Sequence, residues 1–258
     1  MLTGGESRLS RFWLKADENN SSRSVDTLTV LALAYIAIPN FCFLLGWLKL
    51  PYGIAGGLLL LISLWQFVSR QVVWQTEYSK PALVLIVAVA CAWCIFGGAG
   101  HFTYANPDWA TRDAVYADLI YTPWPLAYGE ADGAPLIMRS AIGYFLPPAV
   151  LTHFLGIQAA DWTLYLWTAL GTAVFLLLLP LPKSADTKLG IALLLVIFFS
   201  GMDFLGTVLR NGDLPIFPLR LEWWVPFSYS SLSGQLFWAP NHTLPIWITA
   251  ALFYRHWA

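Results

Sequence analysis

Long runs of apolar residues follow one another along the chain, separated by shorter polar stretches. Five of these runs lie at about residues 28–48, 52–69, 82–100, 161–181 and 188–208. A further run begins near Leu236 and is interrupted by Ala-Pro-Asn-His. Because a bilayer core of about 30 Å takes roughly 20 apolar residues in helical form, the pattern predicts an all-α polytopic membrane bundle with about six transmembrane helices.

The segment 136–157 is apolar but differs from these runs. It contains Arg139, the adjacent Pro147 and Pro148, and His153. A proline lacks the amide hydrogen that a helix interior needs, and an ionisable side chain is costly in hydrocarbon without a partner. We therefore predict a broken interfacial or re-entrant element that does not cross the membrane.

Composition agrees with a membrane protein. Apolar residues make up 58% of the chain and charged residues 11%, whereas about a quarter of the residues in an ordinary soluble domain are charged. The formal net charge of −1, without a basic stripe, argues against a nucleic-acid partner. Cys91 and Cys94 form a CxxC inside an apolar run, where a packing role is expected. No zinc-binding spacing occurs, so no metal site is predicted, and the sequence does not determine whether a divalent cation takes part.

The distribution of lysine and arginine predicts the orientation. Residues 1–27 are polar and contain four of these cations, so we expect a cytoplasmic segment rather than a cleavable signal peptide. Residues 28–258 then form a single transmembrane domain. With the N-terminus in the cytoplasm, the two long loops, about 101–160 and 209–242, lie on the non-cytoplasmic face.

The first long loop begins with residues 101–135, which hold five of the fifteen acidic residues of the chain. Asn106 followed by Pro107 is typical of a helix start, with Asp108 in the first turn. The helix should run to about Tyr121, because the prolines of the following Thr-Pro-Trp-Pro end it.

Two aspartates of this predicted helix point in different directions. At about 100° per residue, Asp113 falls on a stripe of aromatic and aliphatic side chains, and Asp108 lies four residues before Arg112 on another face. The Asp108–Arg112 pair can be an ordinary surface ion pair or part of a working site. A carboxylate at Asp113 needs a cation from another segment, such as Arg139 or Arg210, or else its pKa rises through desolvation.

The second long loop is rich in aromatic residues and proline. Tryptophan and tyrosine suit the headgroup layer of a membrane, so most of them are expected to be interfacial. Arg210, Arg220 and His242 are different, because cations beside the membrane can bind a lipid-linked phosphate. Asn241 and His242 also follow a proline, where freed backbone groups need water, a side chain or a ligand.

Over about residues 82–258 the chain resembles the GT-C glycosyltransferases. The resemblance lies in the arrangement of spans, in an external loop that starts with Asp108 and Asp113 on a short helix, and in an apolar element with paired prolines. Members of that family use polyprenyl-phosphate-linked sugars, and a carboxylate early in the first external loop acts as base toward the acceptor. The resemblance implies Asp108 and Asp113 as candidate catalytic residues, with Asp108 favoured. It implies Arg112, Arg139, Arg210, Arg220 and His242 as candidate substrate contacts.

The resemblance also predicts partners and location. The chain would lie in the bilayer of a bacterial inner (plasma) membrane. It would bind a polyprenyl-phosphate sugar donor and a saccharide or lipid acceptor. Its reaction would belong to the assembly of cell-envelope polysaccharide or glycolipid. Residues 28–69 would be an added hairpin, because the acidic loop of that family follows its first span. The alternative is a non-enzymatic membrane protein, such as a lipid-linked saccharide flippase or a polysaccharide-assembly partner. A carboxylate that shares a cavity with a basic group would favour the enzyme.

Overall fold

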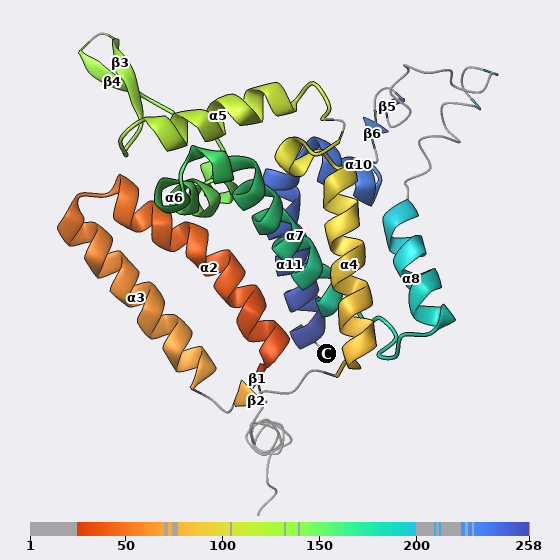
Figure 1. Cartoon of the computed structure of the whole chain (residues 1–258). Coiled ribbons are helices and arrows are strands. Elements are labelled where there is room, and N and C mark those ends of the chain that lie inside the picture. Colours follow the sequence, from red (N-terminus) through yellow and green to blue (C-terminus); the bar gives the residue numbers. More distant parts are fainter. Residues whose placement is uncertain are drawn as a thin grey trace, which may run out of the picture.

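The protein is mostly helical (Figure 1). The structure, a computed structural model, describes residues 25–69, 72–73, 77–103, 105–131, 133–138, 140–199, 209, 212, 223–224, 227–228 and 230–257. The longer helices are α2 (Thr27–Trp47), α3 (Leu50–Val68), α4 (Lys80–Phe96), α5 (Trp109–Tyr121), α6 (Leu146–Leu155), α7 (Ala160–Leu178), α8 (Thr187–Phe198), α10 (Leu232–Trp238) and α11 (Pro240–Trp257). Short 3-10 helices are η1 (Ala99–His101), η2 (Ile142–Tyr144) and η3 (Ile157–Ala159).

The strands form small two-stranded pairs. β3 (Ala127–Ala131) and β4 (Ala134–Ile137) make an antiparallel hairpin, which the sequence pattern did not predict. The other pairs join β1 (Val25–Asp26) to β2 (Val72–Val73) in parallel and β5 (Trp223–Trp224) to β6 (Phe227–Ser228) antiparallel.

Among the described residues, three helical segments are long and apolar enough to cross a membrane: α2, α3 and Ile157–Leu178. The expected spans 28–48, 52–69 and 161–181 therefore correspond to long helices. The expected spans 82–100 and 188–208 correspond to shorter apolar helices, α4 and α8. Residues 200–208 lie outside the described residues.

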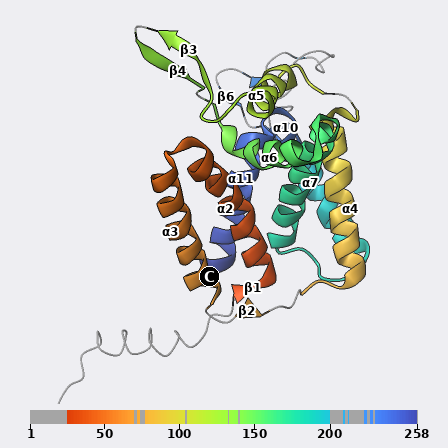
Figure 2. The same ribbon diagram turned by 60° about the vertical axis from the view of Figure 1, so that its left-hand side comes forward.

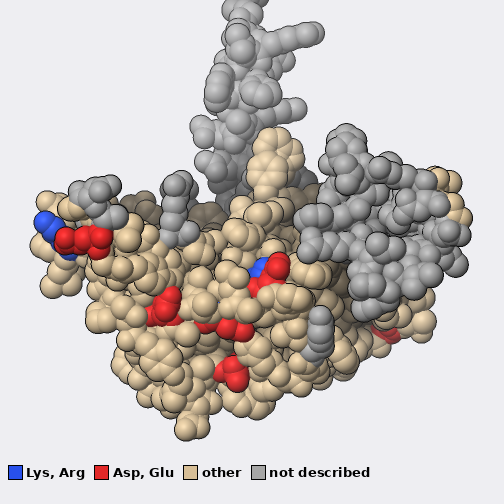
Figure 3. Space-filling model, turned by 90° about the horizontal axis from the view of Figure 1, so that it is seen from above, with Lys and Arg blue, Asp and Glu red and all other residues tan. Residues whose placement is uncertain are grey.

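The longer apolar helices run between two ends of the molecule (Figures 1 and 2). One end, called the α5 end below, carries α5, α6, the β3–β4 hairpin and α10. The C-terminus and β1–β2 lie at the other end. Both predicted long loops thus contribute to the same end of the bundle. Seen from above, the described charged side chains visible on this face are mostly acidic (Figure 3).

Helix α7 lies at the centre of the bundle and contacts α4, α11, α6 and α2. Its polar side chains bond within the protein, because Thr168 Oγ1 donates to Leu164 O and Thr172 Oγ1 donates to Thr168 O. The buried Cys94 of α4 lies with its Sγ 3.2 Å from Thr172 Oγ1. Cys94 is therefore a packing residue, as the apolar setting of the CxxC predicted.

Helix α3 packs on α2 through glycines. A Cβ at Gly53 would lie 2.4 Å from Leu44 O, and one at Gly57 would lie 3.0 Å from Phe41 Cε2. Small residues four apart let two helices approach closely, as in membrane helix pairs. The rest of α3 is largely exposed, including the large side chains of Leu59 and Trp65. A bilayer covers such a surface without the cost that water imposes.

The segment 136–157 is broken, as predicted, into the end of β4, η2 and α6. Helix α6 has ten residues, so it rises only about 15 Å, roughly half of a bilayer core. The interruption predicted near Leu236 is the boundary between α10 and α11, at Ala239.

An ionic cluster holds the end opposite α5 together. The Asp26 side chain accepts from Thr29 N at 2.7 Å and caps α2, and it also pairs with Arg255 of α11. Glu77 pairs with Arg255 at 3.4 Å and with Lys183 at 2.9 Å. These contacts tie the start of α2 to the end of α11, a structural role for the ion pairs at this end.

Candidate functional site

Helix α5 starts at a fixed position because Asn106 holds both the helix and a neighbouring segment. The Asn106 side-chain oxygen accepts from Asp108 N at 3.0 Å, and its Nδ2 donates to Phe237 O of α10 at 2.6 Å. Trp109 is 1% exposed, and its Nε1 donates to Gly97 O, just after α4, at 3.2 Å. The sequence placed the helix start at Asn106-Pro107 and its end at Tyr121; the observed helix begins at Trp109 and ends at Tyr121.

A cavity of about 310 Å³ opens beside this helix start. Its lining comes from α5, from the chain before η2, from the residue before α6 and from the start of α11: Asp108, Thr111, Arg112, Val115, Ser140, Phe145, Asn241 and His242. The cavity therefore combines a carboxylate with basic groups from two segments far apart in the sequence. We call it the charged cavity.

Arg112 is the main cation of the charged cavity. Its side chain is 13% exposed, and its Nη2 lies 3.7 Å from Asp108 Oδ2, an ion pair longer than a hydrogen bond. Its Nη1 is buried without a hydrogen-bond partner among the described residues. The guanidinium carbon lies 5.7 Å from the centre of the Trp109 ring. Burial lowers the pKa of Arg112 from its ordinary value, but a guanidinium keeps its charge at any ordinary pH.

The start of α11 supplies another part of the lining. The side-chain oxygen of Asn241 is buried and has no hydrogen-bond partner among the described residues. His242 is exposed, and its backbone nitrogen donates to Ala239 O at 3.0 Å. The charged cavity thus offers unused donors on Arg112 and an unused acceptor on Asn241. Buried polar atoms of this kind are usually paired, so they indicate a site that takes up a polar group.

Asp113 lies in a different environment, a cluster with His101 and Asp161 at the ends of η1 and α7. His101 Nε2 lies 3.1 Å from Asp113 Oδ2, and His101 Nδ1 lies 3.0 Å from Asp161 Oδ1. Because an ionised carboxylate only accepts hydrogen bonds, two ionised partners require both ring nitrogens to donate, which makes His101 an imidazolium. We call these three residues the His101 cluster.

The electrostatics of the His101 cluster follow from burial and pairing. Partial burial lowers the pKa of His101, but the hydrogen bond to Asp161 and the charge of Asp113 outweigh it, so the pKa is raised overall. Burial raises the pKa of Asp113, and the nearby His101 reduces this effect. The second oxygen of Asp113 is buried without a partner among the described residues.

The local backbone places His101 between the two carboxylates. Gly100 has φ of +77°, and a Cβ there would lie 2.8 Å from both Asp161 O and Tyr165 Cβ. A side chain at this position would therefore strain the backbone and collide with the start of α7. His101 itself has φ of 58°, a conformation that is uncommon outside glycine.

The structure brings together three of the predicted site residues: Asp108, Arg112 and His242. It places Asp113 in the His101 cluster. The remaining candidates, Arg139, Arg210 and Arg220, lie outside the described residues.

Sequence reasoning missed His101 and Asp161. Each directly borders a predicted span, His101 after the third and Asp161 at the start of the fourth. Polar residues that border two spans at the same face were a usable signal, because successive spans bring such positions to one end of a bundle.

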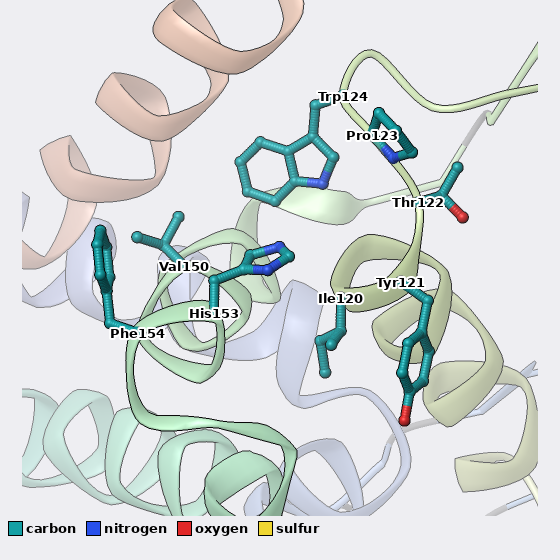
Figure 4. A pocket seen from close by; sticks show the side chains of 8 residues that line it. All are labelled: Ile120, Tyr121, Thr122, Pro123, Trp124, Val150, His153 and Phe154. Carbon is teal, nitrogen blue, oxygen red and sulfur yellow. The ribbon is translucent and has the colours of Figure 1, made fainter.

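A second cavity at the α5 end, of about 410 Å³, has a different character. Figure 4 shows Trp124 and His153 on facing walls of this cavity, with Ile120, Val150 and Phe154 around them. Its described lining includes no carboxylate and no arginine or lysine. It therefore lacks the combination of base and cation that the charged cavity has.

Within the described part of the chain, no group of three or more His, Cys, Asp and Glu side chains has an arrangement that could hold a metal ion. Comparison with known proteins finds no matching family model, no similar curated protein and no similar solved structure.

Proposed function

We propose that the chain is a membrane glycosyltransferase of GT-C type, which transfers a sugar from a polyprenyl-phosphate donor to an acceptor on the non-cytoplasmic face. One observation carries the proposal: Asp108, Arg112 and His242 line the same cavity. A carboxylate together with cations is what the reaction requires, a base near the acceptor hydroxyl and positive charge where the phosphate leaves.

Asp108 suits the role of base. Its side chain is 55% exposed, so an acceptor hydroxyl can reach it from outside. In the proposed step Asp108 takes the proton of that hydroxyl, whose oxygen forms a bond to the anomeric carbon of the sugar. The bond from that carbon to the phosphate oxygen breaks, and its electron pair leaves with the polyprenyl phosphate.

Arg112 suits the role of phosphate contact. A guanidinium presents donors in a planar fork that matches phosphate oxygens, and Arg112 has donors that no described residue uses. Removing a cation from water without hydrogen bonds is costly, and an anionic ligand would reverse that cost. His242 lies in the same lining and adds a second nitrogen donor at the cavity.

The proposal takes α2, α3, α4, α7, α8 and α11 as six membrane-spanning helices, with the α5 end outside and α6 as a re-entrant element. The described lysines and arginines flanking α4, α7, α8 and α11 at the opposite end support a cytoplasmic assignment of that end: Lys80, Lys183, Lys188 and Arg255. A cysteine introduced by Glu130→Cys in the β3–β4 hairpin should react with a membrane-impermeant maleimide in intact cells. Reaction only after permeabilisation would refute this orientation.

The enzymatic step is tested with the full chain in isolated membranes and a panel of radiolabelled polyprenyl-phosphate hexoses. Product is measured as transferred sugar and as released polyprenyl phosphate. Asp108→Asn should reduce turnover by roughly 10²-fold or more, as expected for a lost general base. Asp118→Asn on the same helix is the matched control, because Asp118 accepts from Tyr128 and does not line the charged cavity.

Two results would contradict the enzymatic proposal. One is full turnover by Asp108→Asn at wild-type protein levels. The other is Arg112-dependent binding of these lipids without any release of polyprenyl phosphate. The second result would favour the non-enzymatic alternative, a flippase or assembly partner that holds lipid-linked saccharides.

A further inference from the structure

A neutral cavity of about 380 Å³ lies directly beside the charged cavity. Its walls come from α2, from η2 and the chain before it, from α7 and from α11. The two cavities share Ser140 and Asn241 as lining residues. Its described lining contains no charged side chain, so an ionic group has no partner among those residues.

Aromatic side chains and buried hydrogen-bonding atoms without a described partner characterise the lining residues of the neutral cavity. Trp167 and Tyr35 both line it, and their rings stack at 4.2 Å with an angle of 14°. The Tyr35 hydroxyl already donates to Trp167 O at 3.3 Å. By contrast, Trp167 is 7% exposed and its Nε1 has no acceptor among the described residues. Asn241 adds its unpaired side-chain oxygen.

These features distinguish between two kinds of occupant. A hydrocarbon chain would leave the indole N–H and the amide oxygen without hydrogen bonds, which is unfavourable for buried polar groups. An uncharged group that carries several hydroxyls can satisfy both atoms while its C–H faces contact the aromatic rings. The volume lies within the range of small-molecule sites.

We infer that the neutral cavity holds the sugar ring of the lipid-linked donor, with Trp167 Nε1 as donor and Asn241 Oδ1 as acceptor to its hydroxyls. This inference rests on the proposed function. In such a donor the phosphate is bonded directly to the anomeric carbon, so the sugar site must adjoin the phosphate site. The shared residues Ser140 and Asn241 provide this connection between the neutral and charged cavities.

Two variants test the inference without removing a known structural contact. Trp167→Phe keeps an aromatic ring but removes an N–H that no described residue uses. Gly143→Leu fills the cavity, because a Cβ at Gly143 has only Pro39 Cβ within 4 Å, at 3.8 Å. Matched controls are Trp65→Phe on the exposed face of α3 and Gly190→Leu on α8, where an added Cβ meets nothing within 4 Å.

Affinity is measured with the purified full chain in nanodiscs, and thermal unfolding verifies that each variant folds. The probes are undecaprenyl phosphate and the same lipid linked to glucose, galactose, mannose or N-acetylglucosamine. At least one sugar-linked lipid should bind more tightly than undecaprenyl phosphate. Trp167→Phe should weaken the binding of that sugar-linked lipid by about tenfold, as for the loss of one hydrogen bond. The affinity for undecaprenyl phosphate should stay unchanged. Gly143→Leu should abolish the advantage of the sugar, and both controls should match the parent chain.

Each other outcome overturns the inference in a distinct way. If Trp167→Phe weakens the binding of undecaprenyl phosphate as much as that of the sugar-linked lipid, the neutral cavity holds the hydrocarbon chain. Unchanged binding in both variants, or no sugar-linked lipid that binds better than undecaprenyl phosphate, would leave the cavity without a substrate role. In those cases Arg112-dependent binding of undecaprenyl phosphate would still support the proposed function. If none of the lipids binds through Arg112, the proposed function fails as well.

Discussion

The two aspartates at the start of α5 show how different two carboxylates on one short helix can be. Asp108 faces the charged cavity and has only a loose ion pair with Arg112 at 3.7 Å. Asp113 lies five residues further on, about 140° around the helix axis, and is held by His101 at 3.1 Å. Asp108 is therefore the more exposed and more loosely paired carboxylate among the described residues, whereas Asp113 links α5 to η1 and α7.

The comparison also shows what holds each region in place. The His101 cluster joins three segments through its own hydrogen bonds. Among the described residues, the lining of the charged cavity shows no such hydrogen-bond network, only the Asp108–Arg112 ion pair. Buried groups outside the lining, such as Trp109 and Asn106, hold its walls in place. A site that keeps its polar atoms unpaired needs this external support, because its own side chains contribute little to its stability.

The largest expected effect comes from the residue that supports both regions. Trp109 packs under Arg112 and lies edge-on to the His101 ring, with ring centres 5.8 Å apart. Trp109→Ala should reduce the free energy of unfolding by about 3–5 kcal/mol, as for other large-to-small core substitutions. Tyr121→Ala at the exposed end of the same helix is the control and should change it by less than about 0.5 kcal/mol. Equal effects in a detergent unfolding assay would show that α5 is not anchored through Trp109.

The next largest effect is on lipid binding, which should depend on the charged cavity and not on the His101 cluster. Arg112→Gln removes the charge, and Arg112→Lys keeps the charge but loses the planar fork. Arg112→Gln should weaken undecaprenyl phosphate binding by roughly 10- to 100-fold, the range of charge-assisted hydrogen bonds, with a smaller loss for Arg112→Lys. Thermal unfolding should change little, because no described residue accepts a hydrogen bond from Arg112. If Arg112→Gln binds undecaprenyl phosphate as tightly as the parent chain does, Arg112 does not contact the phosphate.

The smallest effect is a pH dependence that belongs to the His101 cluster. Since pairing with Asp161 and Asp113 raises the folded-state pKa of His101, its stabilisation is complete below the unfolded pKa of about 6.5. The stabilisation is lost as the pH rises through the raised folded-state pKa. His101→Gln should therefore abolish the decrease in thermal stability between about pH 6.5 and the folded-state pKa.

Asp113 also makes the fold less stable as the pH rises, but at lower pH than His101. Burial raises its folded-state pKa, so its ionisation destabilises the fold as the pH rises above about 4. Asp113→Asn should remove that lower step and weaken the step that depends on His101. A pH profile identical to the parent chain in both variants would show that the cluster does not contribute to the pH dependence of stability.

Features within one segment could be predicted well. The end at Tyr121 and the Asp108–Arg112 pair follow from helix geometry, and the structure confirms both. The predicted start was wrong by two residues: Asp108, not Asn106, is the N-cap, so Asp108 precedes the first turn, and Asn106 instead accepts from Asp108 N. The hydrophobic setting predicted for Asp113 is also present, with Trp109 and Tyr116 buried on the same stripe. The need for a cation from another segment was foreseen, although the described partner is His101.

The sequence by itself determined the apolar runs, the approximate positions of the helices and the relative directions of residues on one helix, because these depend on local chemistry and on a fixed helical period. Only the tertiary structure decided which segments meet. It places Asn241 and His242 of α11 beside Arg112 of α5, and Asp161 of α7 beside His101. Such contacts depend on how α7 packs against its neighbours, and that packing is a sum of many small contacts. The borders of the predicted spans indicated only that His101 and Asp161 share one end of the bundle, not that their side chains touch.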